Sequence, residues 1–337
     1  MPILGAQQWT YWQYAHSLAS APRMLIGHRG ACSLPMPRNG LPRCPHTAKR
    51  AFCRLPEAGD DGGMHKIDGV LSKFDGVARA KHFAAAGISD FQLRAALATG
   101  QVSRVARGVY ARQGANPTLV AIRSLPAEPA CISAAEFAGL WVVERPRVPH
   151  VAAPHSRKYP GFICHRSAAP PTLLDSVVQA LRCMPDLDGL VIAESAVALG
   201  KVELSALRTR LTGRNDARER RLVSMIVPQS QSIIECIARF LLRQAGFHVE
   251  SQVNIPGMGH LDLMVDGRLG IETDGTGFHM DKASFEEDRR RWNVTTRLGV
   301  PTLVVSHALL VQRPREFVWM VRETLKSLDR GLTTQAA

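Results

Sequence analysis

The chain has 337 residues, enough for two or three domains with separate apolar cores. Its 42 Lys and Arg against 29 Asp and Glu give a formal net charge of +13, which favours a polyanionic partner such as nucleic acid over an inert basic surface. No stretch approaches the roughly 20 consecutive apolar residues of a membrane helix. We therefore expect a cytoplasmic protein without a membrane span.

Seven cysteines occur along the chain, and none of them forms a CxxC pair. This pattern indicates neither a disulfide framework nor a zinc ribbon, in agreement with a reducing cytoplasm. One grouping has metal-ligand residue types, but its irregular spacing in a Pro- and Arg-rich stretch argues against zinc: Cys32, Cys44, His46 and Cys53.

Residues 1–63 show no sustained helical or strand period and end in a Gly-Asp-Asp-Gly-Gly run at 59–63. Such a segment lacks the apolar pattern of a folded core. We expect a disordered tail, or sequence upstream of a physiological start at Met64.

From residue 64 the pattern changes to three short amphipathic segments, at 67–74, 78–86 and 89–99. Ser89 and Gln92 have the spacing of a capping box at the start of the third segment. Two short strands then follow, with a turn at Arg107-Gly108. Three helices and a hairpin predict a winged helix-turn-helix over residues 64–113.

Four basic residues on the expected third helix and hairpin lie where such a domain meets phosphates: Arg94, Arg104, Arg107 and Arg112. The alternative is a charged, solvated face on a small helical module that binds other proteins. The sequence leaves both interpretations open.

The region 114–230 predicts a mixture of helices and strands: a helix over 133–140 with Ser133 and Glu136 as its capping pair, strand-like pieces over 147–165, and helices near 173–184 and 189–212. We recognise no chemical motif in it. The Arg-rich stretch 214–221 can contact DNA, but a solvated helix face or a linker explains it equally well.

Residues 232–328 follow the order αβββαβ with one further helix. The predicted elements are a helix over 232–245, strands over 247–255, 260–266 and 268–274, a helix over 281–298, a strand over 302–306 and a helix over 314–328.

Acidic residues alternate with apolar ones on two of these strands. Asp262 points away from the apolar face of its strand, and Glu272 and Asp274 share one face of the next. Carboxylates held side by side on adjacent strands are the oxygen ligands that Mg²⁺ needs for phosphodiester hydrolysis.

The register of this hairpin decides whether the two strands can form one site. A two-residue turn would pair Asp262 with Ile271 and direct Glu272 to the opposite face. A three-residue loop at 266–268 pairs Asp262 with Glu272 instead. We predict this loop or an equivalent bulge.

Two further residues flank the strands. Glu235 lies on the first helix, from which its carboxylate can reach a metal or orient a water; the alternative is an ordinary i,i+4 pair with Arg239. His279 follows the third strand and can act as an acid or base near neutral pH, although a single loop histidine is usually just exposed.

A family resemblance appears in features that follow one another along the chain: Glu235, Asp262, the run from Ile271 to His279, and Asp288-Arg289. Together they resemble the very-short-patch-repair-like branch of the PD-(D/E)XK nuclease superfamily, over about residues 230–328. The spacing within the run is also similar to that of the mismatch endonuclease itself, at Thr273, Gly275, Phe278 and His279.

This resemblance implies a restriction-endonuclease-like αβββαβ core over 231–330, in a chain of mixed α/β (α+β) class. It implies Asp262 and Glu272 as ligands of Mg²⁺ or Mn²⁺, Glu235 as a supporting residue and His279 as the acid-base group. Asp274 is a further candidate catalytic residue, but it stands where the superfamily usually has a lysine. That departure leaves a degenerate, non-cleaving domain as an alternative.

The region from 64 to about 170 resembles AbiEi-type antitoxin-like proteins, through a winged helix from Ile67, the hairpin ending at Tyr110 and the helix at 133–136. The resemblance implies promoter binding and a cognate nucleotidyltransferase-like toxin as partner. Its fusion to a nuclease-like end is similar to a separate bacterial group.

Two functions follow from these patterns. The first is a DNA-binding, Mg²⁺-dependent endodeoxyribonuclease, which the carboxylates favour. The second is a transcriptional regulator or antitoxin-like protein whose nuclease fold serves binding alone.

Overall fold

The computed structural model describes residues 61–274 and 282–335, which form helices and three small sheets of mixed α+β class. Residues 1–60 of the tail expected over 1–63 lie outside the described residues, together with the grouping around Cys32 and Cys53. Residues 61–63, which that prediction included in the tail, instead begin the first described helix. None of the helices within the described ranges combines the length and the apolar composition that crossing a membrane requires.

The N-terminal part of the described chain contains the helices and the hairpin that the sequence predicts. Its elements are α2 (Asp61–Lys73), β1 (Val77–Arg79), α3 (Ala80–Ala85), α4 (Asp90–Ala98), β2 (Ser103–Ala106) and β3 (Val109–Ala111). The Ser89 hydroxyl accepts from the backbone of Gln92 and the Gln92 side chain accepts from Ser89, so the capping box is confirmed. Strand β1, which the sequence analysis missed, pairs with β3 in a sheet of order β1-β3-β2.

The middle region is a helical layer with a small sheet. Its elements are α5 (Pro117–Ser124), β4 (Glu128–Pro129), α6 (Cys131–Phe137), β5 (His150–Ala153), β6 (Ile163–Arg166), α7 (Leu173–Cys183), α8 (Asp186–Ala198), α9 (Leu204–Arg210) and α10 (Ala217–Ser224). Its sheet has the order β4-β5-β6, and β5 and β6 run parallel.

Two sequence predictions in the middle region are wrong. A single helix over 189–212 is absent, because Gly200 adopts a φ of 65° after α8 and the chain begins a separate helix, α9. Ser133 does not cap a helix: α6 begins at Cys131, and the Ser133 hydroxyl accepts the backbone N–H of His150 at 2.9 Å. Ser133 therefore joins α6 to β5.

The C-terminal part follows the predicted order, with one additional short helix. Its elements are α11 (Ile233–Gln244), β7 (Val249–Ile255), β8 (Gly259–Val265), β9 (Leu269–Asp274), α12 (Lys282–Arg297), β10 (Thr302–Ser306), α13 (His307–Gln312) and α14 (Pro314–Gln335). The sheet has the order β10-β9-β8-β7, in which β9 and β10 are parallel and the other neighbours antiparallel.

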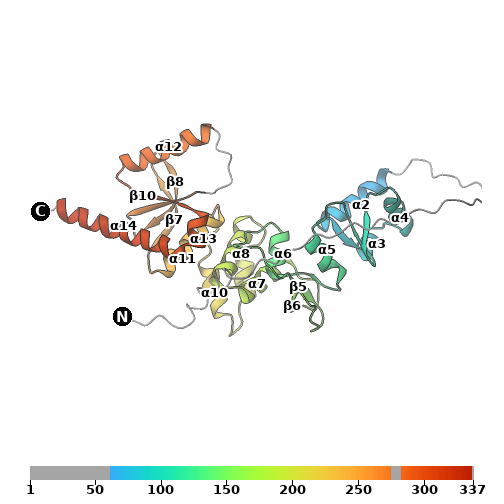
Figure 1. Ribbon diagram of the computed structural model, residues 1–337. Helices are drawn as coiled ribbons and strands as arrows, with labels where there is room; N and C mark the ends of the chain where they lie inside the picture. The colour runs from blue at the N-terminus through green and yellow to red at the C-terminus, as the bar shows by residue number, and fades with distance from the viewer. Residues whose placement is uncertain (1–60, 275–281, 336–337) are drawn as a thin grey trace, which may run out of the picture. The chain divides into compact units, whose positions relative to one another are not determined.

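Helices cover both faces of this sheet (Figure 1), with α12 on one side and α11, α13 and α14 on the other. Leu263 and Ile271 are buried in the core that includes α11 and α14. Met264 is buried with Val294 of α12 on the opposite face. The polar positions of β8 and β9 that alternate with Leu263 and Ile271 therefore face the side of α12.

Candidate functional site

The hairpin between β8 and β9 has the register that the sequence predicts. Val265 pairs with Leu269, so the loop contains three residues, 266–268. Leu263 pairs with Ile271, and this register places Asp262 opposite Glu272 on one face of the sheet. The prediction of a three-residue loop is confirmed, and the two carboxylates lie on neighbouring strands.

Asp262 is fixed by its neighbouring strand. Its Oδ2 atom accepts the backbone N–H of Thr273 at 2.8 Å and the Thr273 hydroxyl at 2.6 Å. The paired residues of β8 and β9 end at Leu263 and Ile271, and the Asp262 side chain links the two strands beyond that point. Two hydrogen bonds set the direction in which the other oxygen of Asp262 points.

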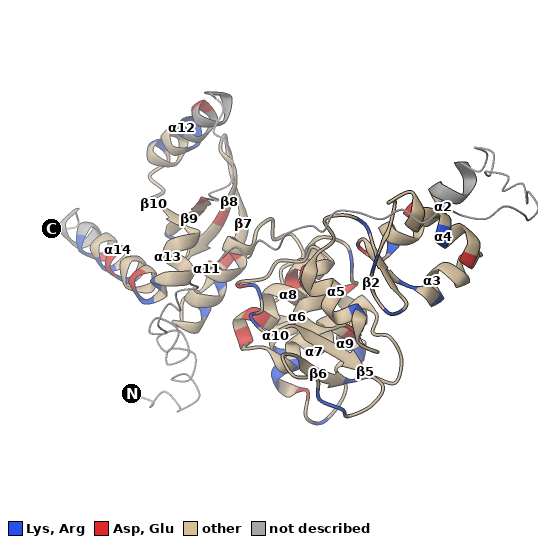
Figure 2. Cartoon of the chain, turned by 45° about the vertical axis from the view of Figure 1, so that its right-hand side comes forward, with Lys and Arg blue, Asp and Glu red and all other residues tan. Residues whose placement is uncertain are grey.

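Glu272 faces helix α12. Its Oε1 atom lies 2.9 Å from Nη2 of Arg291, which also donates to the backbone carbonyl of His260 at 2.8 Å. Both side chains of the pair are mostly buried, at 16% exposed for Glu272 and 24% for Arg291. Figure 2 shows acidic positions on the adjacent strands β8 and β9, across from α12. Arg291 could not be identified from the sequence, because its contact with Glu272 joins helix α12 to strand β9 and depends on how the two elements pack.

Glu235 is buried at the start of α11, with 2% of its surface exposed. Its Oε2 atom accepts from the backbone N–H of Gln231 at 3.2 Å and from the Gln252 amide at 2.8 Å. Gln252 lies in β7 with a φ of 53°, opposite Asp262 in a register with β8 that is the same on both sides of it. Burial, followed by the negative charge of Asp262, raises the pKa of the Glu235 carboxyl.

The alternative pairing of Glu235 with Arg239 is wrong. Arg239 is fully buried and forms its ion pair with Glu194 of α8. Glu235 instead bonds to Gln231 and Gln252, and it feels the charge of Asp262.

No contact among the described residues joins Asp274 or His279, the two remaining predicted site residues, to Asp262, Glu272 and Glu235. Asp274 is exposed at the end of β9, in register with Ser306 of β10. His279 lies outside the described residues.

The four arginines predicted to bind DNA are all exposed on α4 and the β2–β3 hairpin. Arg107 is in the turn between the strands, as predicted, with Gly108 at a φ of 69°. Arg94 donates to the Asp90 carbonyl at 3.2 Å and Arg112 to the Ser72 hydroxyl at 3.1 Å, so these two side chains also have contacts within the protein. Arg104 on β2 and Arg107 in the following turn therefore lie on the same exposed hairpin.

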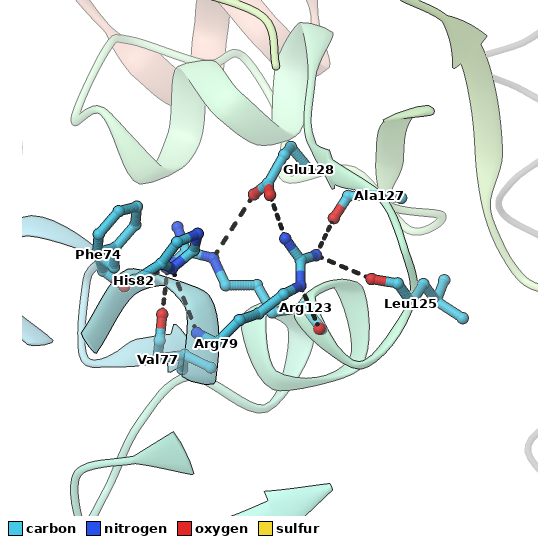
Figure 3. Close-up of polar contacts among 8 residues, drawn as sticks. All are labelled: Phe74, Val77, Arg79, His82, Arg123, Leu125, Ala127 and Glu128. Carbon is cyan, nitrogen blue, oxygen red and sulfur yellow. Dashed lines mark hydrogen bonds and ion pairs between the residues drawn. The ribbon is translucent and has the colours of Figure 1, made fainter. Parts of the chain in front are cut away.

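Other arginines of this part of the chain form hydrogen bonds and ion pairs within the protein. Figure 3 shows Arg79 and Arg123 converging on Glu128, and Arg79 forms an ion pair with this carboxylate. Arg123 lies over the Phe74 ring, which stacks on His82 with centroids 3.9 Å apart. Burial lowers the pKa of His82 to about 4, so this imidazole is neutral at physiological pH.

In the stretch 214–221 the arginines bond to the protein as well. Arg218 donates to Asp186 at 2.6 Å and Arg220 to the Gly213 carbonyl at 2.7 Å. These contacts support the interpretation of this stretch as a structural helix face rather than a DNA contact.

A second cluster escaped the sequence analysis. Cys131, His150, His165 and Cys183 approach one another in the middle region and can hold a metal ion. Hydrogen bonds from Cys131 and then from the two histidines lower the pKa of Cys183. No sequence signal identified this group, because its members are far apart in the chain and lack the paired spacing of a zinc motif.

Comparison with protein-family models gives no match for this chain, and comparison with curated proteins gives none either.

Proposed function

We propose that residues 231–330 form a PD-(D/E)XK-type endonuclease core that hydrolyses DNA phosphodiester bonds with Mg²⁺ or Mn²⁺. The observation that supports the proposal is the register of β8 and β9, which places Asp262 opposite Glu272. The charge of Asp262 also contributes to the raised pKa of Glu235. Carboxylates on rigid neighbouring elements are the donors that these cations prefer.

The oxygen donors of these side chains are of the kind that a divalent cation prefers. Burial, followed by the negative charge of Asp262, disfavours ionisation of Glu235. A cation bound by Asp262 and Glu272 would offset the part of that cost that comes from the charge of Asp262, and it would supply Lewis-acid stabilisation of the phosphate oxygens.

The side chains of the chain have separate roles in this proposal. Thr273 positions Asp262 through its two hydrogen bonds. Glu235 accepts the proton of the attacking water, a task for which a raised carboxyl pKa is suited. Arg291 brings a positive charge to Glu272, on the side of the sheet where the superfamily's lysine is replaced by Asp274.

The test uses the full-length protein with supercoiled plasmid and single-stranded DNA, in EDTA and then in Mg²⁺ or Mn²⁺. We expect Asp262→Asn to lower metal-dependent cleavage by at least about 100-fold, since it removes an anionic oxygen without changing the side chain's size. Asp266→Asn is the matched control, because Asp266 lies in the adjacent loop with a φ of 50°, which Asn tolerates. Equal cleavage by wild type and Asp262→Asn would contradict the proposal.

A second candidate function rests on the Arg291–Glu272 ion pair. A guanidinium bound to one of the proposed metal ligands, with no lysine two residues after Glu272, also suits a degenerate core that binds DNA without cutting it. The protein would then be a transcriptional regulator or an antitoxin-like protein opposed to a toxin. Tight promoter binding without cleavage in any metal would favour this function.

We further propose that residues 64–113 are a winged helix-turn-helix that docks DNA through α4 and the β2–β3 hairpin. The exposure of Arg94, Arg104 and Arg107 supports it. Replacing Arg94 and Arg107 by Gln should weaken binding to different sequences about equally and reduce the salt slope by roughly one unit per lost phosphate contact. Arg221→Gln on α10 is the control, and an unchanged slope in the double variant would count against docking through this face.

A further inference from the structure

Four metal-ligand side chains meet in the middle region, each from a different element. Cys131 is the first residue of α6, His150 the first of β5, His165 belongs to β6, and Cys183 is the last residue of α7. Figure 1 shows these elements packed together in the middle region. One ligand atom from each side chain lies within 4.8 Å of all the others.

The two histidines are brought together by the parallel pairing of β5 with β6. His150 is opposite Ile163 and His165 is opposite Ala152, so both imidazoles project from the same face, two positions apart. Nδ1 of His150 and Nε2 of His165 are 3.2 Å apart. Sγ of Cys183 lies 3.8 Å from the same His150 nitrogen.

These separations are those of a tetrahedral zinc site. Zinc bonds of roughly 2.05 Å to nitrogen and 2.3 Å to sulfur give tetrahedral edges of about 3.3 Å between two nitrogens and about 3.6 Å between nitrogen and sulfur. Two thiolates and two imidazoles are also the soft and borderline donors that select Zn²⁺ over Mg²⁺.

We propose that Cys131, His150, His165 and Cys183 bind one structural Zn²⁺. All four coordination positions are filled by the protein, which is typical of a structural rather than a catalytic zinc. The ion would join α6 and α7 to the sheet strands β5 and β6, whose own apolar cluster is small: Ile122, Ala127, Val151, Ala153 and Tyr159.

The surroundings agree with such a site. Cys131 and His150 are buried, whereas Cys183 is exposed, so the site is closed on one side and reachable by the ion on the other. Cys131 has a φ of 52°, a left-handed conformation that is uncommon for a residue with a β-carbon. The Cys131 Sγ atom nevertheless lies within 4.8 Å of a ligand atom of each of the other three side chains.

The experiment measures zinc in full-length protein purified without a polyhistidine tag and passed through metal-free buffer. Elemental analysis should give about one zinc per chain, as a closed four-ligand site requires. We expect at least a tenfold lower zinc content in Cys183→Ser and in His165→Ala. Cys164→Ser is the matched control, because Cys164 is adjacent to His165 but projects from the opposite face of β6.

A second measurement on wild type covers the case in which a ligand variant fails to fold. Cobalt exchanged for the metal should give the intense visible absorption of tetrahedral Co²⁺ with thiolate ligands, and chelation should lower Tm. Wild-type protein without zinc and without cobalt absorption would overturn the proposal. A disulfide between Cys131 and Cys183, found by peptide mapping of protein alkylated at lysis, would overturn it equally.

Discussion

Arg239 of α11 and Glu194 of α8 form an ion pair with 1% and 0% of their side chains exposed. Glu194 also accepts the backbone N–H of Val227 at 3.0 Å, and Arg239 also donates to the Ser251 hydroxyl at 3.4 Å. The pair therefore lies inside the core that the middle helices share with the C-terminal sheet. Each charge is compensated only because the other is present.

Removing one partner of this pair should be strongly destabilising. We expect Glu194→Gln to lower the free energy of unfolding by about 3–5 kcal/mol, because the Arg239 charge stays buried without its counter-ion. The double variant Glu194→Leu with Arg239→Met should recover most of that loss. Urea denaturation measures both.

The control for this prediction is Arg221→Gln, which breaks an exposed pair with Asp186 and should cost less than about 1 kcal/mol. A cost for Glu194→Gln no larger than for this surface variant would show that the pair is not buried in solution.

Glu235 should make the metal-free protein less stable as pH rises. Its pKa is raised in the folded state, so the folded protein holds this proton more tightly than the unfolded chain does. The cost of ionisation is absent below about pH 4.3, the ordinary Glu pKa, and fully present above the folded pKa. Glu235→Gln should therefore have the higher Tm at pH 8 in EDTA.

The difference in Tm between Glu235→Gln and wild type should shrink as pH falls, measured by thermal melts in steps from pH 8 to pH 5. Glu250→Gln, on the exposed edge strand β7, should show no such trend. A difference that grows on acidification has the wrong sign for a raised carboxyl pKa.

Glu128 should stabilise the junction between the N-terminal helices and α5. It pairs with Arg79 and lies 3.9 Å from Arg123, whose side chains are only 15% and 7% exposed. Glu128→Gln leaves both guanidinium groups without their shared counter-ion, and we expect a loss of about 2–3 kcal/mol by urea denaturation. Glu136→Gln is the control, because its partner Arg145 is 86% exposed. Equal losses for the two variants would rule out a special role of Glu128.

Gly270 should tolerate no side chain. A Cβ atom there would lie 2.8 Å from the Thr302 hydroxyl and 3.1 Å from the Leu261 side chain. Gly270→Ala should cost about 1–3 kcal/mol through overpacking between β9 and its neighbours. Gly69→Ala, within α2 and with open space around the added atom, should instead gain about 0.5–1 kcal/mol. Denaturation curves that shift in the same direction for both variants would contradict this packing.

The sequence by itself determined most elements of the C-terminal domain and the register of its central hairpin. Strand β10 begins and ends at the predicted residues, and Asp262 lies opposite Glu272 as the three-residue loop requires. These features depend on the local period of apolar residues and on turn length, both of which can be read from a single stretch of chain.

Only the tertiary structure decided which partners the charged and metal-ligand residues find. The i,i+4 spacing made Arg239 a possible ion-pair partner of Glu235, but because α11 packs on α8, Arg239 pairs with Glu194 instead. Likewise, Arg291 reaches Glu272 because α12 covers that face of the sheet. Such contacts depend on how separate elements pack, which one-dimensional periodicity does not encode.

The same reason explains the Cys and His cluster. Cys131 begins helix α6 and Cys183 ends helix α7. The two helices pack together, but strands β5 and β6 lie between them in the chain. Because the chain returns through β5 and β6 before the second cysteine, no short motif precedes the site. The sequence supplied the ligand types, and the pairing of β5 with β6 brought them within reach of one ion.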